Sequence, residues 1–217
     1  MPVKVGLKFI EQWNDCLEDK VREYEAEQQE KGQIVFYGPS YFTRWSTQYG
    51  MKPMREVLVG KSGAPCVVNR GFGSSCAEHQ LYYYPRMVRP LEPKVLVYSC
   101  YANSAAFGYT PDETWELALR VLTYARTDFP DIHIYLCGAQ RSRQITPEQM
   151  EVREAFDQRL KAYAEQTPNC TFVDVLGYEP LMRDDVYVND GVHFNQLGYD
   201  IYGQLFQKVL EKELDAF

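Results

Sequence analysis

Short hydrophobic runs occur at five places along the chain. Each run is rich in β-branched and aromatic residues and ends at or near a glycine, serine, cysteine or aspartate, which is typical of buried β-strands. The runs lie at residues 33–38, 66–71, 94–100, 132–138 and 170–175. We therefore expect five strands.

The longer segments around these runs have the spacing of amphipathic helices. From residue 8 to 31 apolar residues recur on one face, which predicts an N-terminal helix ending at Gly32. Two further segments begin at Thr110 and Thr146 with a capping box and an early proline. These two predicted helices span residues 110–129 and 146–166, and two more span residues 75–88 and 195–214.

Strands that alternate with helices favour a mostly parallel sheet, because parallel neighbours need a crossover connection. The sequence therefore predicts an α/β fold with helices on both faces of the sheet. With 217 residues, 45% of them hydrophobic, the chain is long enough for one substantial core. We find no repeat or linker and expect one domain over 1–217, with a helix within 1–31 packed on it.

The charge and the cysteines narrow the function classes. A net charge of −7 and a pI near 5.1 argue against a nucleic-acid partner, because such binding depends on clustered Lys and Arg. No apolar run is long enough to span a bilayer, and the N-terminus is too charged for a signal peptide, so we expect a cytoplasmic protein. The six cysteines lack metal-ligand spacing, and we expect neither disulfides nor zinc.

In open α/β sheets ligands bind at the carboxyl ends of the strands, so the loops there are the place to look for chemistry. After the first run, Gly38 and Pro39 force a turn that presents Ser40. A serine here is either a helix cap or a nucleophile. The G-x-S-x-G elbow is absent, since Phe42 occupies its second glycine position.

A serine nucleophile needs a base, and Asp190 lies three residues before His193. A carboxylate so placed can fix the tautomer of the imidazole and stabilise its protonated form. The alternative is that Asp190 caps the last helix and His193 is an ordinary polar residue. His79, inside a predicted helix, and His133, near the start of a strand, are weaker candidates.

Acyl transfer also needs donors for the oxyanion. Backbone N–H groups at Gly73 and Ser74 and the side-chain amide of Asn103 are candidates, although each residue is also a common turn former. A cysteine nucleophile at Cys100 or Cys137 is disfavoured, because no basic residue adjoins either thiol.

Four ordered blocks resemble the SGNH (GDSL-like) hydrolase superfamily, of the esterase and acetylhydrolase type. The last block, D-G-x-H-x-N-x-x-G-Y, is the most specific. The resemblance implies a three-layer α/β/α sandwich, the flavodoxin-like fold of that superfamily, and agrees with the strand and helix pattern. The blocks are "IVFYGPS", "VVNRGFGSS", "VLVYSCYANSAAFGYTPDE" and "DGVHFNQLGY", between residues 33 and 199.

By position, the resemblance places the nucleophile at Ser40, the base at His193 and the acid at Asp190. The implied function is a serine ester hydrolase that works through an acyl-enzyme and needs no cofactor. Its substrate would be a small-molecule ester: a short acyl ester, an acetylated sugar or a lysolipid. Two alternatives are a binding protein that kept the fold but lost turnover, and an acyltransferase.

The resemblance places the oxyanion donors at the backbone N–H of Ser40, a backbone N–H at Gly73 or Ser74, and the side chain of Asn103. Several neighbours depart from the family pattern, in particular Pro39, Ser74, Tyr101, Ala102 and Ser104. If residue 74 needs a positive φ, a serine there costs about 1 kcal/mol. The sequence "RSR" at 141–143 could meet an anionic substrate, although a solvated loop is the simpler interpretation.

Overall fold

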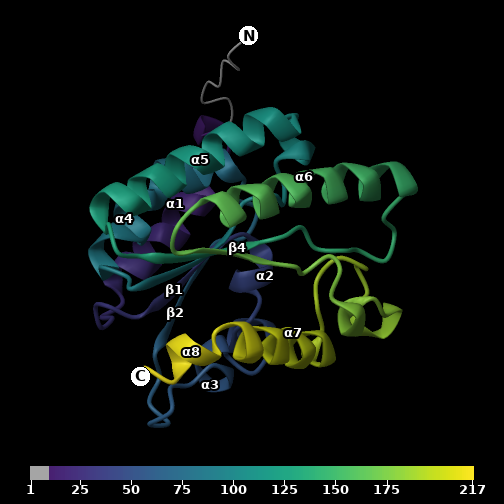
Figure 1. Ribbon diagram of the computed structural model, residues 1–217. Coiled ribbons are helices and arrows are strands. Elements are labelled where there is room, and N and C mark those ends of the chain that lie inside the picture. The colour runs from purple at the N-terminus through teal and green to yellow at the C-terminus, as the bar shows by residue number, and fades with distance from the viewer. Residues whose placement is uncertain (1–9) are drawn as a thin grey trace.

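The computed structural model describes residues 10–217, with side chains from Leu17 onward. At its centre is a five-stranded sheet in which every neighbouring pair is parallel (Figure 1). Each strand lies inside one of the five predicted runs. The strands are β1 (Ile34–Gly38), β2 (Val67–Gly71), β3 (Val95–Ser99), β4 (His133–Cys137) and β5 (Cys170–Val173).

Helices cover both faces of this sheet and give three layers (Figure 1). Successive strand residues point to opposite faces, so Val35 and Tyr37 pack with one helix group and Ile34 and Phe36 with the other. The first group is α1 (Ile10–Ala26), α4 (Ala77–Met87), α5 (Pro111–Asp128) and α6 (Pro147–Gln166). The second is α2 (Ser40–Thr43), α3 (Met54–Val57), α7 (Gln196–Val209) and α8 (Glu211–Leu214). Short 3₁₀ helices occupy Thr47–Tyr49, Arg89–Leu91, Ala105–Phe107, Glu179–Leu181 and Asp184–Val186.

The strand order is β2-β1-β3-β4-β5. From β1 the chain passes to the edge strand β2 and then returns past β1 to β3, so the connections leave the centre of the sheet in opposite directions. At such a switch point a crevice forms outside the carboxyl ends of the strands. The loops that follow β1, β2 and β3 therefore frame the place where a ligand is expected.

The predicted capping boxes of α5 and α6 are confirmed. The Thr110 hydroxyl accepts from the Glu113 N–H at 3.2 Å, and the Thr146 hydroxyl accepts from the Gln149 N–H at 3.2 Å. In each box the longer side chain also accepts from the backbone N–H of the threonine. These bonds fix where α6 begins, and the first turns of α6 border the site described below.

The N-terminal helix is shorter than its apolar pattern predicted. α1 ends at Ala26 and not at Gly32, while residues 8 and 9 of the predicted helix lie outside the described part of the chain. Tyr24 is the last apolar residue of the helix to be buried, and residues 27–31 are all polar or charged. Without an apolar face to pack, those residues gain nothing from remaining helical.

The C-terminal segment, predicted as one helix over 195–214, is two helices separated at Leu210. Leu210 is fully buried, and its ψ of 13° departs from helical geometry. The break turns Leu214 toward the core. The carbonyl of Leu214, at the helix end, accepts from the Phe217 N–H at 3.3 Å and from the Lys61 N–H at 3.0 Å.

Candidate active site

Ser40 lies at the carboxyl end of the central strand β1. Gly38 ends the strand and Pro39 is the N-cap of α2, which makes Ser40 the first residue of that helix. Because Pro39 occupies the N-cap and the Ser40 hydroxyl lies 2.9 Å from His193 Nε2, the cap interpretation of this serine is wrong. A Cβ on Gly38 would come within 3.0 Å of the Ser99 Cβ on β3, which is why the strand closes here with glycine.

A second glycine lets α2 lie directly on strand β2. A Cβ on Gly71 would come within 2.3 Å of the Thr43 nitrogen, so a larger residue would displace the helix that carries the serine. Asn69 adds two bonds: its amide donates to the Phe42 carbonyl at 2.7 Å, and its oxygen accepts from the Gly71 N–H at 2.8 Å. The position of Ser40 is thus set by the edge strand β2 as well as by β1, the strand that it follows.

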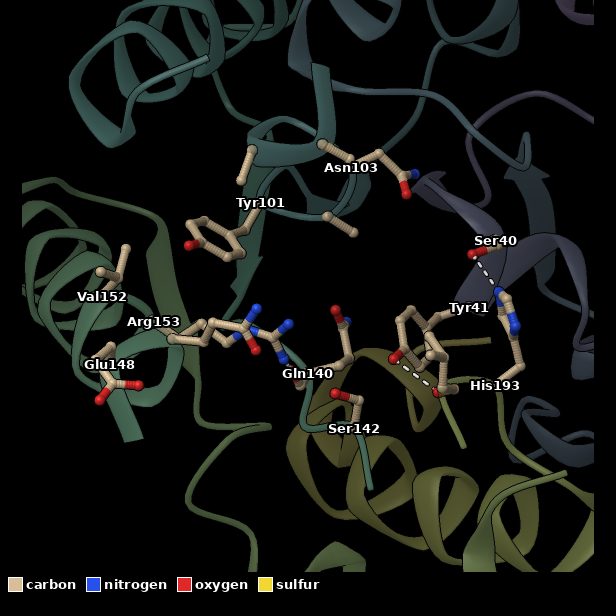
Figure 2. Close-up of a pocket in the computed structure, with 15 residues that line it drawn as sticks. Ser40, Tyr41, Tyr101, Asn103, Gln140, Ser142, Glu148, Val152, Arg153 and His193 are labelled. Carbon is tan, nitrogen blue, oxygen red and sulfur yellow. Dashed lines mark hydrogen bonds between the residues drawn. The ribbon is translucent and has the colours of Figure 1, made fainter. Parts of the chain in front are cut away.

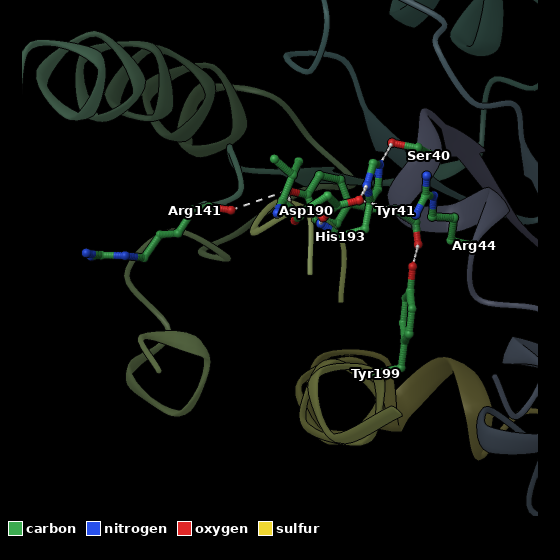
Figure 3. Close-up of polar contacts among 8 residues, drawn as sticks. Ser40, Tyr41, Arg44, Arg141, Asp190, His193 and Tyr199 are labelled. Atoms are coloured by element: carbon green, nitrogen blue, oxygen red, sulfur yellow. Dashed lines mark hydrogen bonds and ion pairs between the residues drawn. The ribbon is translucent and has the colours of Figure 1, made fainter. Parts of the chain in front are cut away.

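Three side chains join in one hydrogen-bonded chain (Figure 3). His193 Nε2 lies 2.9 Å from Ser40 Oγ, and His193 Nδ1 lies 2.7 Å from Asp190 Oδ2. A carboxylate only accepts hydrogen bonds, so Nδ1 carries the proton and Nε2 is left to accept from the serine hydroxyl. The structure therefore brings together the three residues that the sequence singled out for catalysis.

The turn between Asp190 and His193 holds this geometry. Asp190 Oδ1 accepts from the backbone N–H groups of Val192 and His193, at 2.8 and 2.9 Å. Gly191 supplies the positive φ of 68° that the turn requires. The cap of α7 is Asn195, whose side chain accepts from the Gly198 N–H at 3.0 Å, so Asp190 does not cap the last helix.

The pKa values of Asp190 and His193 both lie below their ordinary values. Burial raises the pKa of the Asp190 carboxyl, but hydrogen bonds from His193 and the Val192 N–H outweigh it and bring this pKa down to about 2. For His193, burial lowers the pKa below its ordinary value; the bond to Asp190 opposes this shift, and the charge of Arg44 adds to it. At neutral pH the pair is therefore a carboxylate and a neutral imidazole, as a general base requires.

Two tyrosines for which the sequence predicted no role tie the serine to the segments around the histidine. The Tyr41 hydroxyl donates to the Val192 carbonyl at 2.8 Å, and the Tyr199 hydroxyl donates to the Tyr41 carbonyl at 3.0 Å (Figure 3). Each bond spans about 150 positions in the sequence, with separations of 151 and 158. The only sequence signal for Tyr41 is its place directly after Ser40.

The turn after β2 approaches the serine closely. A Cβ on Gly73 would lie 3.9 Å from the Ser40 Cβ, and the Ser75 N–H donates to the Phe72 carbonyl at 3.3 Å to close the turn. Ser74 has a φ of 64°, so it adopts the left-handed conformation that a glycine would occupy without strain. The serine costs about 1 kcal/mol there.

Asn103, the third predicted donor, joins the loop after β3 to the turn after β2. Its side-chain amide donates to the Ser75 carbonyl at 2.9 Å. An amide has two hydrogens, so the second remains for a ligand. Asn103 also has a positive φ, 67°, which asparagine tolerates better than most residues.

A cavity of about 670 Å³ opens beside Ser40 and His193 (Figure 2), within the size range of small-molecule sites. We call one side the reaction wall, formed by Ser40, Tyr41, Val192 and His193. The lining residues from the loop after β3, the loop after β4 and α6 we call the substrate wall: Tyr101, Ala102, Ala105, Ala106, Gln140, Ser142, Glu148, Gln149, Val152 and Arg153. Asn103 lines the cavity as well.

The remaining histidines and the two cysteines lie elsewhere. His79 is buried in α4, where its Nδ1 accepts from the Cys76 N–H at 3.2 Å. His133 begins β4, at the opposite end of the sheet from the cavity, and its ring lies 2.8 Å from the Thr171 hydroxyl. Burial raises the pKa of Cys100 to about 12 and that of Cys137 far above its ordinary value, so neither thiol forms a thiolate readily.

The "RSR" sequence contributes only its middle residue to the cavity. Arg141 lies outside the cavity lining, and its side chain points away from the hydrogen-bonded chain (Figure 3). Arg143 donates to the Asp184 carbonyl at 2.8 Å. The cation that does line the cavity is Arg153, in the second turn of α6, and its place in the helical pattern gave no signal that it would face a site.

The family of this chain follows from a comparison of its sequence with protein-family models. The model described as the GDSL-like Lipase/Acylhydrolase family matches residues 36–201, a span that includes Ser40, Asp190 and His193. The chain belongs to this family. It is accordingly a serine hydrolase that acts on carboxylic ester bonds. The resemblance to SGNH hydrolases found in the motifs is thereby confirmed.

Solved structures show the same fold. A candidate acylhydrolase from Bacteroides fragilis is 23% identical with a TM-score of 0.72, and covers 91% of this chain and 97% of its own. A GDSL-like lipase from Bacteroides thetaiotaomicron is 21% identical, with a TM-score of 0.70 and coverages of 91% and 98%. A variant of an acetyl-xylooligosaccharide esterase from Geobacillus is 16% identical, with a TM-score of 0.65 and coverages of 82% and 94%. A search of curated proteins found no match.

These likenesses confirm the three-layer α/β/α fold with its parallel sheet. None of the helices between residues 10 and 217 has the length and apolar character needed to cross a membrane.

Proposed function

We propose that this ester hydrolase uses Ser40, His193 and Asp190 as a catalytic triad. The observation that carries the proposal is the hydrogen-bonded chain of 2.9 and 2.7 Å, which joins a serine and a histidine 153 positions apart at one end of the sheet. The lowered pKa of His193 supports it, because a neutral imidazole is ready to accept the serine proton.

In the proposed reaction His193 takes the proton of Ser40 as the serine oxygen attacks the acyl carbonyl. Asp190 stabilises the imidazolium that forms, and the imidazolium then gives its proton to the departing alcohol. Water enters, and the same histidine activates it to release the acid from the acyl-enzyme.

The negative charge on the carbonyl oxygen would be met by three donors: the backbone N–H of Ser40, a backbone N–H at Gly73 or Ser74, and the Asn103 amide. Two observations support this set. The turn at Gly73 lies beside Ser40, and the bond between Asn103 and the Ser75 carbonyl holds the amide next to that turn.

The size of the cavity supports a small-molecule ester as the substrate, with a short acyl ester and an acetylated sugar as the first classes to test. Tyr41 and Tyr101 both line the cavity, and aromatic side chains suit an apolar acyl group or a sugar ring. One structural neighbour is described as an acetyl-xylooligosaccharide esterase, and acetylated xylo-oligosaccharides therefore belong in the first screen.

Ser40→Ala tests the triad. On 4-nitrophenyl esters of increasing acyl length, kcat should fall about a million-fold, because a triad acts as a unit and only the oxyanion donors and binding remain. A fluorophosphonate probe should label the wild type at Ser40 and should not label the variant. Ester cleavage that survives Ser40→Ala unchanged, in a protein that melts at the wild-type temperature, would defeat the assignment.

Ser46→Ala is a matched control, since Ser46 lies six positions further on and its hydroxyl bonds to the Thr43 carbonyl outside the cavity lining. This variant should keep both turnover and labelling.

Product analysis with a primary alcohol present separates hydrolysis from acyl transfer: free acid is expected as the main product, and a new ester would show transfer.

A further inference from the structure

The substrate wall contains a cation that the proposed reaction does not use. Arg153 projects from α6 toward the loop after β4, where one Nη donates to the Gln140 carbonyl (Figure 2). This bond fixes the direction of the side chain. Arg153 is half-buried and lines the cavity whose other side carries Ser40 and His193.

Most of the guanidinium is left without a protein partner. An arginine has five N–H donors, and within residues 17–217 the one hydrogen bond of Arg153 is that to Gln140. No carboxylate of the described residues lies within ion-pair distance of it. By contrast, Arg44 pairs with Asp190 at 3.5 Å and Arg70 pairs with Glu27 at 2.8 Å.

One acid shares the substrate wall with Arg153. Glu148 lies in the first turn of α6 and is exposed, and it makes no ion pair with the arginine. A hydrogen bond with Thr146 lowers the pKa of Glu148, so its carboxylate is engaged at the helix end. It does not neutralise the guanidinium by contact.

Five other residues of this wall carry an alanine, valine or tyrosine side chain: Tyr101, Ala102, Ala105, Ala106 and Val152. The positive charge of Arg153 acts on tyrosines of both walls. Burial raises the pKa of Tyr101 and of Tyr41, and in each case the charge of Arg153 opposes that shift. In such surroundings a cation attracts an anion more strongly than it would in water.

We propose that Arg153 binds an anionic group of the ester substrate inside this cavity, which makes acidic esters the preferred substrate class. The group is a planar or tetrahedral oxyacid, a carboxylate or a phosphate, because the guanidinium fork matches the geometry of both. The chain as a whole has a net charge of −7, so its overall field does not attract such an ester and the local cation must do so. The inference rests on the proposed role of Ser40 and adds the substrate class.

Two pairs of esters test the proposal, and each pair differs only by a carboxylate against a carboxamide. The first pair, 4-acetoxybenzoate and 4-acetoxybenzamide, places the charge on the alcohol part. The second pair, 4-nitrophenyl monoadipate and 4-nitrophenyl adipamate, places it on the acyl part. The wild type should prefer the anionic member of one pair, and the pair that responds tells which part of the substrate Arg153 contacts.

Arg153→Gln should lower kcat/KM for the preferred anionic ester about 10- to 100-fold, mainly through KM, because a charge-assisted bond is lost from the bound substrate. The neutral partner ester should change by less than about twofold. Arg153→Lys should recover part of the loss, since it restores the charge without the fork.

Arg159→Gln is the matched control. Arg159 lies on the same helix and pairs with Asp112 at 2.7 Å, outside the cavity lining, so the variant loses the same charge without touching the site. It should keep the wild-type preference.

The proposal is overturned if the wild type prefers neither anion, if Arg153→Gln slows charged and neutral esters equally, or if Arg159→Gln has the same effect as Arg153→Gln. Failure of the triad is distinguished by Ser40→Ala, which removes turnover of all four esters only if Ser40 is the nucleophile.

Discussion

The two walls of the cavity are held in different ways. On the reaction wall, Tyr41 bonds to the carbonyl of Val192, and the carboxylate of Asp190 accepts from two N–H groups of the turn that carries His193. On the substrate wall alanine, valine and tyrosine side chains alternate with polar ones. There Arg153 reaches across to a single backbone carbonyl, that of Gln140.

This difference separates two tasks. Reacting groups must be held within about 0.5 Å of the productive geometry, and the dense bonding of the reaction wall supplies that constraint. A wall that only decides which ester enters can consist of side chains that exchange without disturbing the chemistry. Changes on the reaction wall should therefore act on kcat, whereas changes on the substrate wall should act on KM.

Among the changes that test this division, Asp190→Asn should have the largest effect. Its Oδ1 can still accept from Val192 and His193, so the turn should persist, while the charge and the tautomer control are lost. We expect kcat to fall about ten-thousand-fold with little change in KM, measured on a 4-nitrophenyl ester. Asp200→Asn, on the exposed side of α7, is the control and should leave kcat and KM unchanged. A wild-type kcat for Asp190→Asn would show that the acid has no catalytic role.

Asn103→Gly should have the next largest effect. Glycine accepts the φ of 67° and removes only the amide, so a loss of kcat of about 100- to 1,000-fold is expected if the amide meets the oxyanion. Asn169→Gly removes an amide from a second residue of positive φ, 50°, remote from the cavity, and should leave turnover intact. If Asn103→Gly raises KM alone, the residue belongs with substrate binding and not with the reaction.

Arg44→Gln should have the smallest effect, a shift along the pH axis. Arg44 lowers the pKa of His193 because a cation disfavours the imidazolium. Without it the pKa should rise, more of the histidine should be protonated at acidic pH, and the acid limb of kcat/KM should move to higher pH. Arg183→Gln, which breaks only an exposed pair with Asp185, should leave the limb in place. A limb that moves to lower pH for Arg44→Gln would contradict the electrostatic argument.

Sequence reasoning was most successful where a function depends on a local motif. Asp190 and His193 are three positions apart, and the turn between them is closed by bonds within the motif, so their relation is encoded locally. Ser40 could be placed because a strand and a forced turn precede it. The five strands followed from runs whose burial on both faces leaves a continuous hydrophobic signal.

The same reasoning failed where position depends on packing between distant segments. Arg153 lies in a helix whose pattern gives no sign of a cavity, because the space beside it is created by the loops after β3 and β4. Tyr199 is one of 17 tyrosines, and its bond to Tyr41 depends on how α7 lies over α2. The break at Leu210 also depends on packing, since Leu210 and Leu214 both join a core formed by distant segments.

The hydrogen bond from Tyr41 to the carbonyl of Val192 joins the loop after β1 to the loop before α7. Ser40 and His193 lie 153 positions apart in the sequence, yet the hydrogen bond from the Tyr41 hydroxyl to the Val192 carbonyl holds their two segments together before any ester arrives. Mixing enzyme with substrate should therefore begin with acylation at full speed, and no slow assembly of the centre should precede the first turnover.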